Sequence, residues 1–144
     1  MFTDFRGHPQ WDPTGNFLLF YLRDEKRWVV FDTRNSSFRD ISTAIGYPVY
    51  DELHDRPEAA PSYGIAGWSD TGKSVYLYDR YDIWEVSLHE DTPPVALTGE
   101  QGRKNRLSFR IAGREEGVIS IKGRKEVFLQ AVHEETKEEG VYRL

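Results

Sequence analysis

Short apolar runs separated by polar turns recur along the chain. Phe17–Tyr21 and Ser74–Tyr78 each follow a Pro-Thr-Gly or Asp-Thr-Gly stretch, where glycine reaches positive φ at little steric cost and reverses the chain. Each run leads through a second polar turn to another apolar run, at Trp28–Asp32 and Ile83–Leu88. Because no helical periodicity separates these runs, the pattern predicts antiparallel strands joined by hairpins.

These runs belong to an internal repeat. Trp11–Gly15 recurs as Trp68–Gly72, and a second tryptophan follows in each copy at nearly the same offset, Trp28 in the first and Trp84 in the second. The copies close with the pairs Ile41-Ser42 and Leu97-Thr98. The two copies share these four features in the same order, which predicts two equivalent structural units. Each unit is expected to have four strands, the last near 38–41 or 95–97.

The C-terminal part of the chain predicts a third, incomplete unit. Its strands are expected at Ser108–Ile111, Val118–Ile121, Val127–Val132 and Gly140–Leu144. Four-stranded units with a tryptophan and a turn per repeat are typical of a β-propeller. We therefore predict an all-β fold, a partial β-propeller of about two and a half four-stranded antiparallel blades. One partial domain would span 1–144, with repeats at about 5–45, 60–100 and 105–144. A β-sandwich or an open barrel is the alternative.

A long connection, residues 42–62, separates the first two units. Its three prolines disfavour a regular helix or a central strand, although a short helical turn is expected near Thr43–Ile45. Long loops often carry function. Four carboxylates in this loop could bind calcium or the amino terminus of a peptide, or could simply be solvated. They belong to Asp51, Glu52, Asp55 and Glu58.

Charge and composition narrow the possible partners. The 144 residues carry a formal net charge of −5, which disfavours nucleic acid as a partner. There is no cysteine, so disulfides and thiolate metal sites are excluded. No apolar stretch is long enough to span a membrane. Met1–Asp4 lacks the pattern of a signal peptide. The compartment stays open, and a parent protein could be periplasmic, secreted or cytoplasmic.

Several stretches carry a resemblance to a known family. Trp68–Tyr76 resembles the Trp-Ser-Pro-Asp-Gly-Lys motif of TolB-like, WD40-like propeller repeats. A longer series stands in the order found in the propellers of bacterial S9 peptidases, the prolyl oligopeptidase family. Its members are Tyr50-Asp51-Glu52, Asp55-Arg56-Pro57, Tyr63–Trp68, Tyr78–Trp84, Gly102-Arg103-Lys104 and Glu138–Leu144.

The resemblance implies a role in peptide hydrolysis without a catalytic site in this chain. In that family the propeller caps a separate α/β-hydrolase domain and admits short peptides to a Ser-Asp-His triad, whose serine lies in a Gly-x-Ser-x-Gly turn. No such motif occurs here. We therefore expect a non-catalytic portion, without a cofactor, that gates or orients peptides for a hydrolase domain of the same parent serine peptidase. A stand-alone protein-interaction module and a carbohydrate-binding module are the alternatives.

One polar cluster is the candidate substrate-facing site. Asp79, Arg80, Tyr81 and Asp82 lie in the turn between two predicted strands and could present charge to a cavity on one face of a propeller. The alternative interpretation is structural. Aspartate in a hairpin turn hydrogen-bonds nearby backbone amides, while Arg80 and Asp82 support neighbouring units. The spacing favours this second interpretation.

The remaining candidates are weighed in the same way. The four histidines are too widely spaced for a local metal site, and they are His8, His54, His89 and His133. A basic run is expected to pair internally rather than to bind nucleic acid, and it comprises Arg103, Lys104, Arg106, Arg110 and Arg114. The four tryptophans are expected in the core. A partial propeller leaves sheet edges and an apolar face uncovered, so the isolated chain is expected to self-associate.

Overall fold

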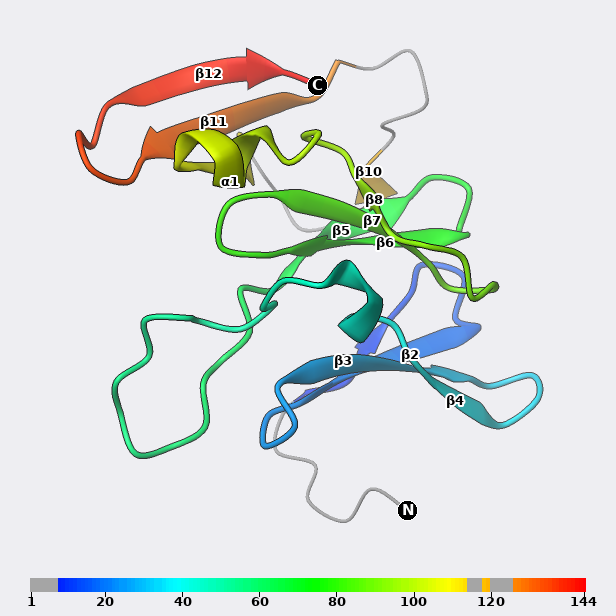
Figure 1. The fold of residues 1–144 in the computed structure, drawn as a ribbon. Helices are drawn as coiled ribbons and strands as arrows, with labels where there is room; N and C mark the ends of the chain where they lie inside the picture. Colours follow the sequence, from blue (N-terminus) through cyan, green and yellow to red (C-terminus); the bar gives the residue numbers. More distant parts are fainter. Residues whose placement is uncertain (1–7, 114–117, 120–125) are drawn as a thin grey trace.

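The computed structural model describes residues 8–113, 118–119 and 126–144 and has three β-sheets stacked one on another (Figure 1). Sheet 1 is a meander of four antiparallel strands in chain order. Its strands are β1 (Gln10–Trp11), β2 (Phe17–Leu22), β3 (Arg27–Asp32) and β4 (Ser37–Asp40). The predicted all-β fold is confirmed.

Sheet 2 repeats this meander and has one additional strand, which comes from a later part of the chain. Its antiparallel strands are β5 (Ile65–Ser69), β6 (Ser74–Tyr78), β7 (Ile83–Ser87) and β8 (Val95–Ala96). The free edge of β5 pairs in parallel with β10 (Val118–Ile119). This strand lies within the extra strand predicted at 118–121, whose last two residues lie outside the described part of the chain.

Sheet 3 has three antiparallel strands in the order β12-β11-β9. They are β9 (Leu107–Ile111), β11 (Phe128–His133) and β12 (Glu139–Arg143). None of the three sheets closes on itself. Two short helices follow the fourth strands of sheets 1 and 2. The first, η1 (Thr43–Ile45), confirms the predicted helical turn, whereas α1 (Gln101–Asn105) was not predicted.

The ladder registers define which residues of sheets 1 and 2 are equivalent. In the second and third strands, Leu18 pairs with Phe31 and Val75 pairs with Val86. Leu18 therefore corresponds to Val75, and Phe31 corresponds to Val86. The chain takes a shorter path from Val75 to Val86 than from Leu18 to Phe31, because the turn between β6 and β7 is tighter than the turn between β2 and β3.

This register corrects the sequence-based pairing of Trp28 with Trp84. Trp28 lies opposite Tyr21, and the equivalent ladder position in sheet 2 is Ile83. Trp84 instead corresponds to Val29. The two tryptophans are not equivalent, and they share one core because they project into it from different sheets.

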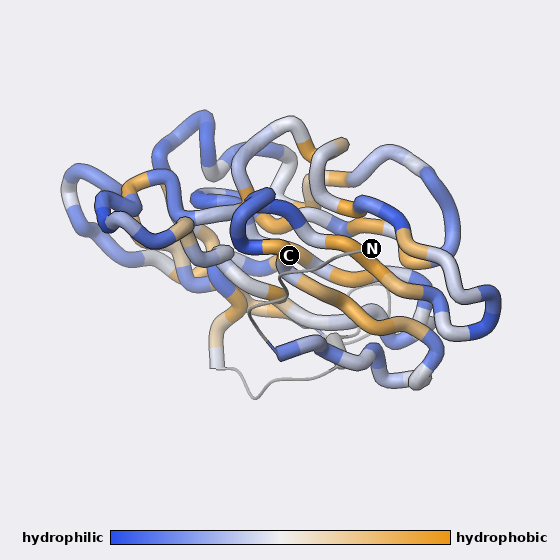
Figure 2. The backbone as a smooth tube through the Cα atoms, turned by 90° about the horizontal axis from the view of Figure 1, so that it is seen from below, coloured by the Kyte–Doolittle hydropathy of each residue, from blue (hydrophilic) through white to orange (hydrophobic). Residues whose placement is uncertain are grey.

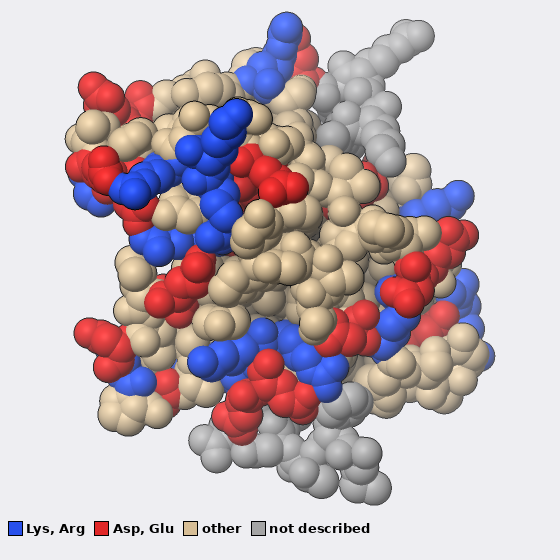
Figure 3. Space-filling model, in the orientation of Figure 1, with Lys and Arg blue, Asp and Glu red and all other residues tan. Residues whose placement is uncertain are grey.

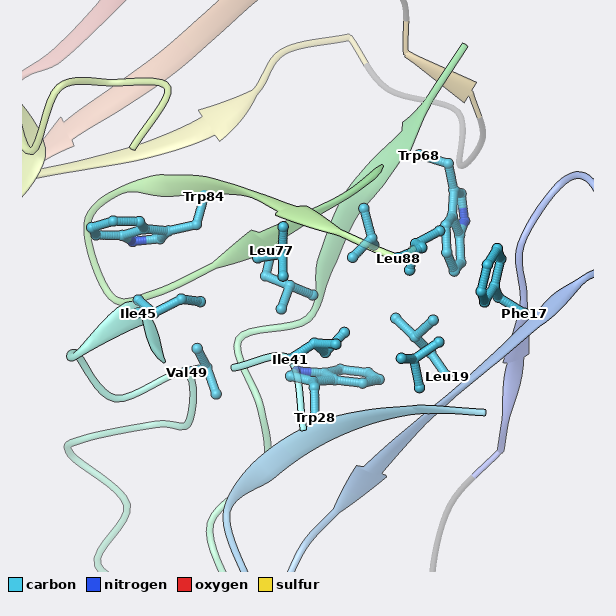
Figure 4. Close-up of a cluster of buried hydrophobic side chains, with 13 residues drawn as sticks. Phe17, Leu19, Trp28, Ile41, Ile45, Val49, Trp68, Leu77, Trp84 and Leu88 are labelled. Atoms are coloured by element: carbon cyan, nitrogen blue, oxygen red, sulfur yellow. The ribbon is translucent and has the colours of Figure 1, made fainter. Parts of the chain in front are cut away.

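The interface between sheets 1 and 2 holds the larger core (Figure 4). Because side chains alternate between the faces of a strand, Phe17 and Leu19 of β2 face sheet 2, while Val75 and Leu77 of β6 face sheet 1. Three tryptophans are buried here with exposed fractions of 4, 8 and 5%, and these are Trp28, Trp68 and Trp84.

The prediction that Trp11 is also a core residue is wrong. It is 56% exposed. Trp11 pairs with Leu18, on the face of sheet 1 that turns away from sheet 2. Its counterpart Trp68 pairs with Val75, on the face of sheet 2 that sheet 1 covers. The two tryptophans hold equivalent ladder positions, so the presence of a neighbouring sheet decides their burial.

The interface between sheets 2 and 3 holds a second apolar cluster. Tyr76, Tyr78 and Ile83 of sheet 2 meet Phe109 and Leu129 of sheet 3. In Figure 2 the central stretches of the coloured tube are mostly hydrophobic and the peripheral loops are mostly hydrophilic. Alternation of facing apolar positions thus accounts for the stacking.

Sheets 1 and 2 end with the same closing motif. In sheet 1, Ile41 N–H donates to the Trp28 carbonyl (3.1 Å), and Trp28 N–H donates to the Ser42 hydroxyl (2.8 Å). Sheet 2 repeats both bonds between its third strand and the pair Leu97 and Thr98, at 2.9 and 3.4 Å. This explains the recurring aliphatic–hydroxyl pair in the sequence, because the hydroxyl satisfies a backbone amide at the end of the sheet.

Candidate functional site

The turn between β6 and β7 carries the four candidate residues and is held by its first carboxylate. Asp79 Oδ1 accepts hydrogen bonds from the backbone N–H groups of Tyr81 and Asp82, both at 2.6 Å. Asp79 Oδ2 accepts a bond from Trp84 Nε1 at 3.1 Å. A single buried carboxylate therefore closes the hairpin and fixes the indole that fills the core beneath it.

The second carboxylate of the turn anchors α1. Asp82 Oδ1 accepts bonds from the Thr98 hydroxyl (2.5 Å) and Gly102 N–H (2.9 Å), and Oδ2 accepts one from Arg103 N–H (2.9 Å). A Cβ at Gly102 would lie 2.6 Å from Asp82 Oδ1 and 2.7 Å from the Tyr81 carbonyl oxygen. Glycine is thus required here because the helix approaches the turn so closely.

Arg103 links the turn to the long loop. Its Nη2 lies 3.4 Å from Glu52 Oε2 and 3.5 Å from Asp79 Oδ2, and the guanidinium lies over the rings of Tyr47 (4.3 Å) and Tyr81 (5.0 Å). Burial acts to lower the pKa of Arg103, but the nearby Asp79 and Glu52 carboxylates outweigh it and raise that pKa. The guanidinium is therefore a permanent positive charge that holds the loop against sheet 2.

A second set of contacts ties the turn to sheet 3. Arg80 forms an ion pair with Glu134, whose carboxylate also accepts a bond from the Tyr81 hydroxyl. Arg110 donates to the Asp79 carbonyl (3.2 Å) and lies over the Tyr78 ring (4.5 Å). Burial lowers the pKa of Arg110. The turn thus joins sheet 2, α1, the long loop and sheet 3.

The four residues make the contacts that the structural interpretation expects. The aspartates bond backbone amides, and Arg80 and Asp82 contact neighbouring elements as expected. Asp79 and Asp82 have no exposed surface, and Tyr81 is 7% exposed. Arg80 is the most exposed of the four, with 21% of its side-chain surface open to solvent. Hydrogen-bond donors of the fold itself occupy both oxygens of each carboxylate.

Sequence patterns did not predict that the side chains of this network lie close together. Arg103 stood in a basic run and Glu52 in a loop of carboxylates, with no signal that they meet around Asp79. The predicted pairing with a carboxylate of an adjacent unit is found for Arg103, which pairs with Asp79, whereas Arg106 pairs with Glu135 of its own unit. Arg110 instead bonds backbone carbonyls, and Arg114 lies outside the described residues. Positive and negative side chains interleave over the face in Figure 3.

The loop carboxylates and the histidines do not form a shared centre. Glu52 pairs with Arg103, and Asp51 accepts a bond from Leu53 N–H at 3.0 Å, while Asp55 and Glu58 are exposed. Among residues 8–113, 118–119 and 126–144, no cluster of three or more histidines and carboxylates could hold a metal ion. Within the same ranges, no helix has the length and apolar character needed to cross a membrane.

A groove of about 700 Å³ lies between α1 and sheet 3. Its walls are largely apolar and include Leu97, Leu107, Phe109, Leu129 and Tyr142. A neighbouring hollow of about 560 Å³ shares Leu107 and Tyr142 with it and reaches Gly140. An apolar groove bordered by a few polar groups is suited to bind an organic side chain or a small ligand.

No protein-family model matches this sequence, and comparisons with curated proteins and with solved structures give no match either.

Proposed function

We propose that this chain is the non-catalytic, β-propeller-type portion of an S9 serine peptidase, which gates or orients peptide substrates for a hydrolase domain of the same parent protein. The stacked sheets would be blades, and the repeated aliphatic–hydroxyl pair would close each of them. The proposal rests on the sequence resemblance together with the architecture described above.

One observation carries the proposal. Sheets 1 and 2 are meanders with matching ladder positions, and they stack face to face with a common closing motif. Successive equivalent sheets that pack by their faces are what propeller blades require. In the β6–β7 turn, the carboxylates of Asp79 and Asp82 accept hydrogen bonds from other groups of the fold. This is compatible with a supporting role.

The sequence of the messenger RNA that encodes these residues is the first test. We expect the same reading frame to encode a Gly-x-Ser-x-Gly motif within a segment whose pattern predicts a strand, a turn and a helix. The second test deletes this segment from that parent protein. If the segment restricts entry, the deletion raises hydrolysis of casein relative to a short prolyl p-nitroanilide. An unchanged ratio in a folded, active deletion variant would contradict gating.

A second candidate is a stand-alone interaction module that associates through its outer faces. Four apolar residues form one row across the outward face of sheet 1, namely Trp11, Leu18, Phe31 and Phe38. Trp11 and Phe38 are 56 and 50% exposed. The equivalent row of sheet 2 is covered by sheet 1, so a partner sheet would suit this face. Light scattering coupled to gel filtration should detect self-association, and a monomer at high concentration would count against it.

A further inference from the structure

The strand β12 has an open edge where sheets 1 and 2 have a further strand. In those two sheets the third strand pairs on its outer side with a fourth, β4 in sheet 1 and β8 in sheet 2. Sheet 3 ends at β12, and among the described residues no strand pairs with its outer side (Figure 1). The unpaired N–H and C=O groups of such an edge can pair with another chain.

The bonds of the β11–β12 hairpin decide which backbone groups point to this edge. His133 N–H donates to the Glu138 carbonyl at 2.9 Å, and the two residues continue the register of the ladder. Bonded and non-bonded pairs alternate along an antiparallel ladder, so the even-numbered residues of β12 bond to β11. The N–H and C=O groups of the odd-numbered residues therefore point to the open edge, and these residues are Glu139, Val141 and Arg143.

Other described edge strands of the stack offer less. Three of them, β1, β8 and β10, have only two residues each, and short edge strands disfavour pairing with another chain. The edge of β9 is occupied, because Phe109 N–H donates to the Tyr81 carbonyl at 2.8 Å. β4 has four residues, but its Arg39 and Asp40 are half-buried in contacts within the chain. β12 extends over five residues, and Val141 at its centre is 72% exposed.

We propose that β12 pairs antiparallel with β12 of a second copy of this chain, about a two-fold axis through Val141. The strand carries an acid at one end and a base at the other. Antiparallel pairing places Glu139 of each copy opposite the partner's Arg143, whereas parallel pairing would bring like charges together. Opposite charges directly across two strands stabilise the pair. The two-fold axis repeats this ion pair at both ends of the interface.

Contacts within one copy leave these charges available. Arg143 forms an ion pair with Glu126 at 3.0 Å, where both side chains are largely exposed, and Glu139 accepts a bond from Gln130 at 3.3 Å. Surface contacts of this kind are weak. Neither contact uses a backbone group of the open edge, so both are compatible with the dimer. The inference rests on β12 alone and is independent of both functions proposed above.

Sedimentation velocity of the whole chain at increasing concentration tests the proposal. A single strand pair is a small interface, so we expect a dimer with a Kd on the order of 100 μM. Glu139→Arg places like charges opposite each other at both ends and should raise the Kd about tenfold or more. Glu139→Arg combined with Arg143→Glu restores unlike pairs, so its Kd should return to within about threefold of the wild type.

Glu90→Arg is the matched control for the charge change. It alters the net charge as much as Glu139→Arg does, at an exposed position outside β12. Its Kd should equal that of the wild type. Circular dichroism establishes that each variant is folded.

A cross-link reports the register directly and does not depend on the charge variants. The chain has no cysteine, so Val141→Cys introduces one thiol next to the proposed axis. The Cα atoms of a bonded antiparallel pair lie about 5.5 Å apart, within the span of a disulfide. Mild oxidation should give a covalent dimer. Val95→Cys, at a valine of β8 that is 57% exposed, is the control and should remain monomeric under the same conditions.

Three results would overturn the proposal. The first is a wild type that stays monomeric at about 1 mM, ten times the expected Kd. The second is a dimer that folded Glu139→Arg does not weaken, or that the charge exchange does not restore, which would point to another surface such as the outer face of sheet 1. The third is Val141→Cys cross-linking no faster than Val95→Cys, and this comparison decides if the charge variants do not fold.

Discussion

The two interfaces of the stack hold equivalent strands together in different ways. Between sheets 1 and 2, three buried indoles and a continuous apolar cluster fill the space. Between sheets 2 and 3 the apolar cluster is smaller, and contacts of the β6–β7 turn with Glu134 and Arg110 join the two sheets at one end. Side-chain packing thus dominates the first interface, and contacts of the β6–β7 turn supplement packing in the second.

Trp84→Ala should have the largest effect because Trp84 serves both interfaces. Removing a buried tryptophan costs about 3–5 kcal/mol, and the change also takes a donor from the buried Asp79 carboxylate, whose loss adds to the cost. Trp68→Ala should fall in the same range without the second contribution. Urea unfolding followed by circular dichroism measures both. Midpoints equal to the wild type would mean that the indoles are not buried in solution.

Asp82→Ala should come next and should act mainly on the second interface. The change leaves the amides of Gly102 and Arg103 and the Thr98 hydroxyl without their acceptor. We expect a loss of about 2–4 kcal/mol, since buried charged hydrogen-bond networks are costly to break. Faster hydrogen exchange should be confined to α1 and its neighbours. Asp91→Ala, at an exposed position, is the control. Uniformly faster exchange would contradict a local role.

Alkaline pH should destabilise the fold through tyrosines of both interfaces. Burial raises the pKa of Tyr21, which packs against the first interface, to about 12, and it raises that of Tyr76 in the second interface to about 12. Their stabilising contribution is complete below the ordinary pKa of 10.0 and is lost as the pH rises toward 12, because the unfolded chain ionises first.

Urea unfolding at pH 9 and pH 11.5 measures this loss. Tyr76→Phe should reduce the fall in unfolding free energy between the two pH values, because phenylalanine does not ionise. An equal fall in wild type and Tyr76→Phe would argue against a buried phenol at this position.

Trp11→Ala should have the smallest effect, although Trp11 and Trp68 hold equivalent ladder positions. A side chain that is 56% exposed loses little burial, so we expect a cost of up to about 1 kcal/mol. The urea midpoint at low protein concentration measures it. A cost as large as that of Trp68→Ala would mean that another surface covers Trp11 in solution, and concentration-dependent midpoints would identify a second copy as that surface.

Local patterns predicted the strands, and non-local contacts determined what the patterns missed. Phe17–Tyr21 and Ile83–Leu88 are recognisable because alternation and turn residues act over a few positions. The short helix α1 has no apolar periodicity, and its closeness to Asp82 depends on residues far from it in the sequence. The exposure of Trp11 follows from which sheet lies opposite. A single sequence does not contain that information locally.

The parallel strand β10 has a consequence for the order of folding during synthesis. Every other strand pair in sheets 1 and 2 joins neighbours in the chain, so each hairpin can form soon after it leaves the ribosome. β10 joins Val118 to Trp68, and the free edge of β5 stays open until that later segment has been made. Translation speed between these positions therefore sets how long an unpaired strand edge is available to other nascent chains.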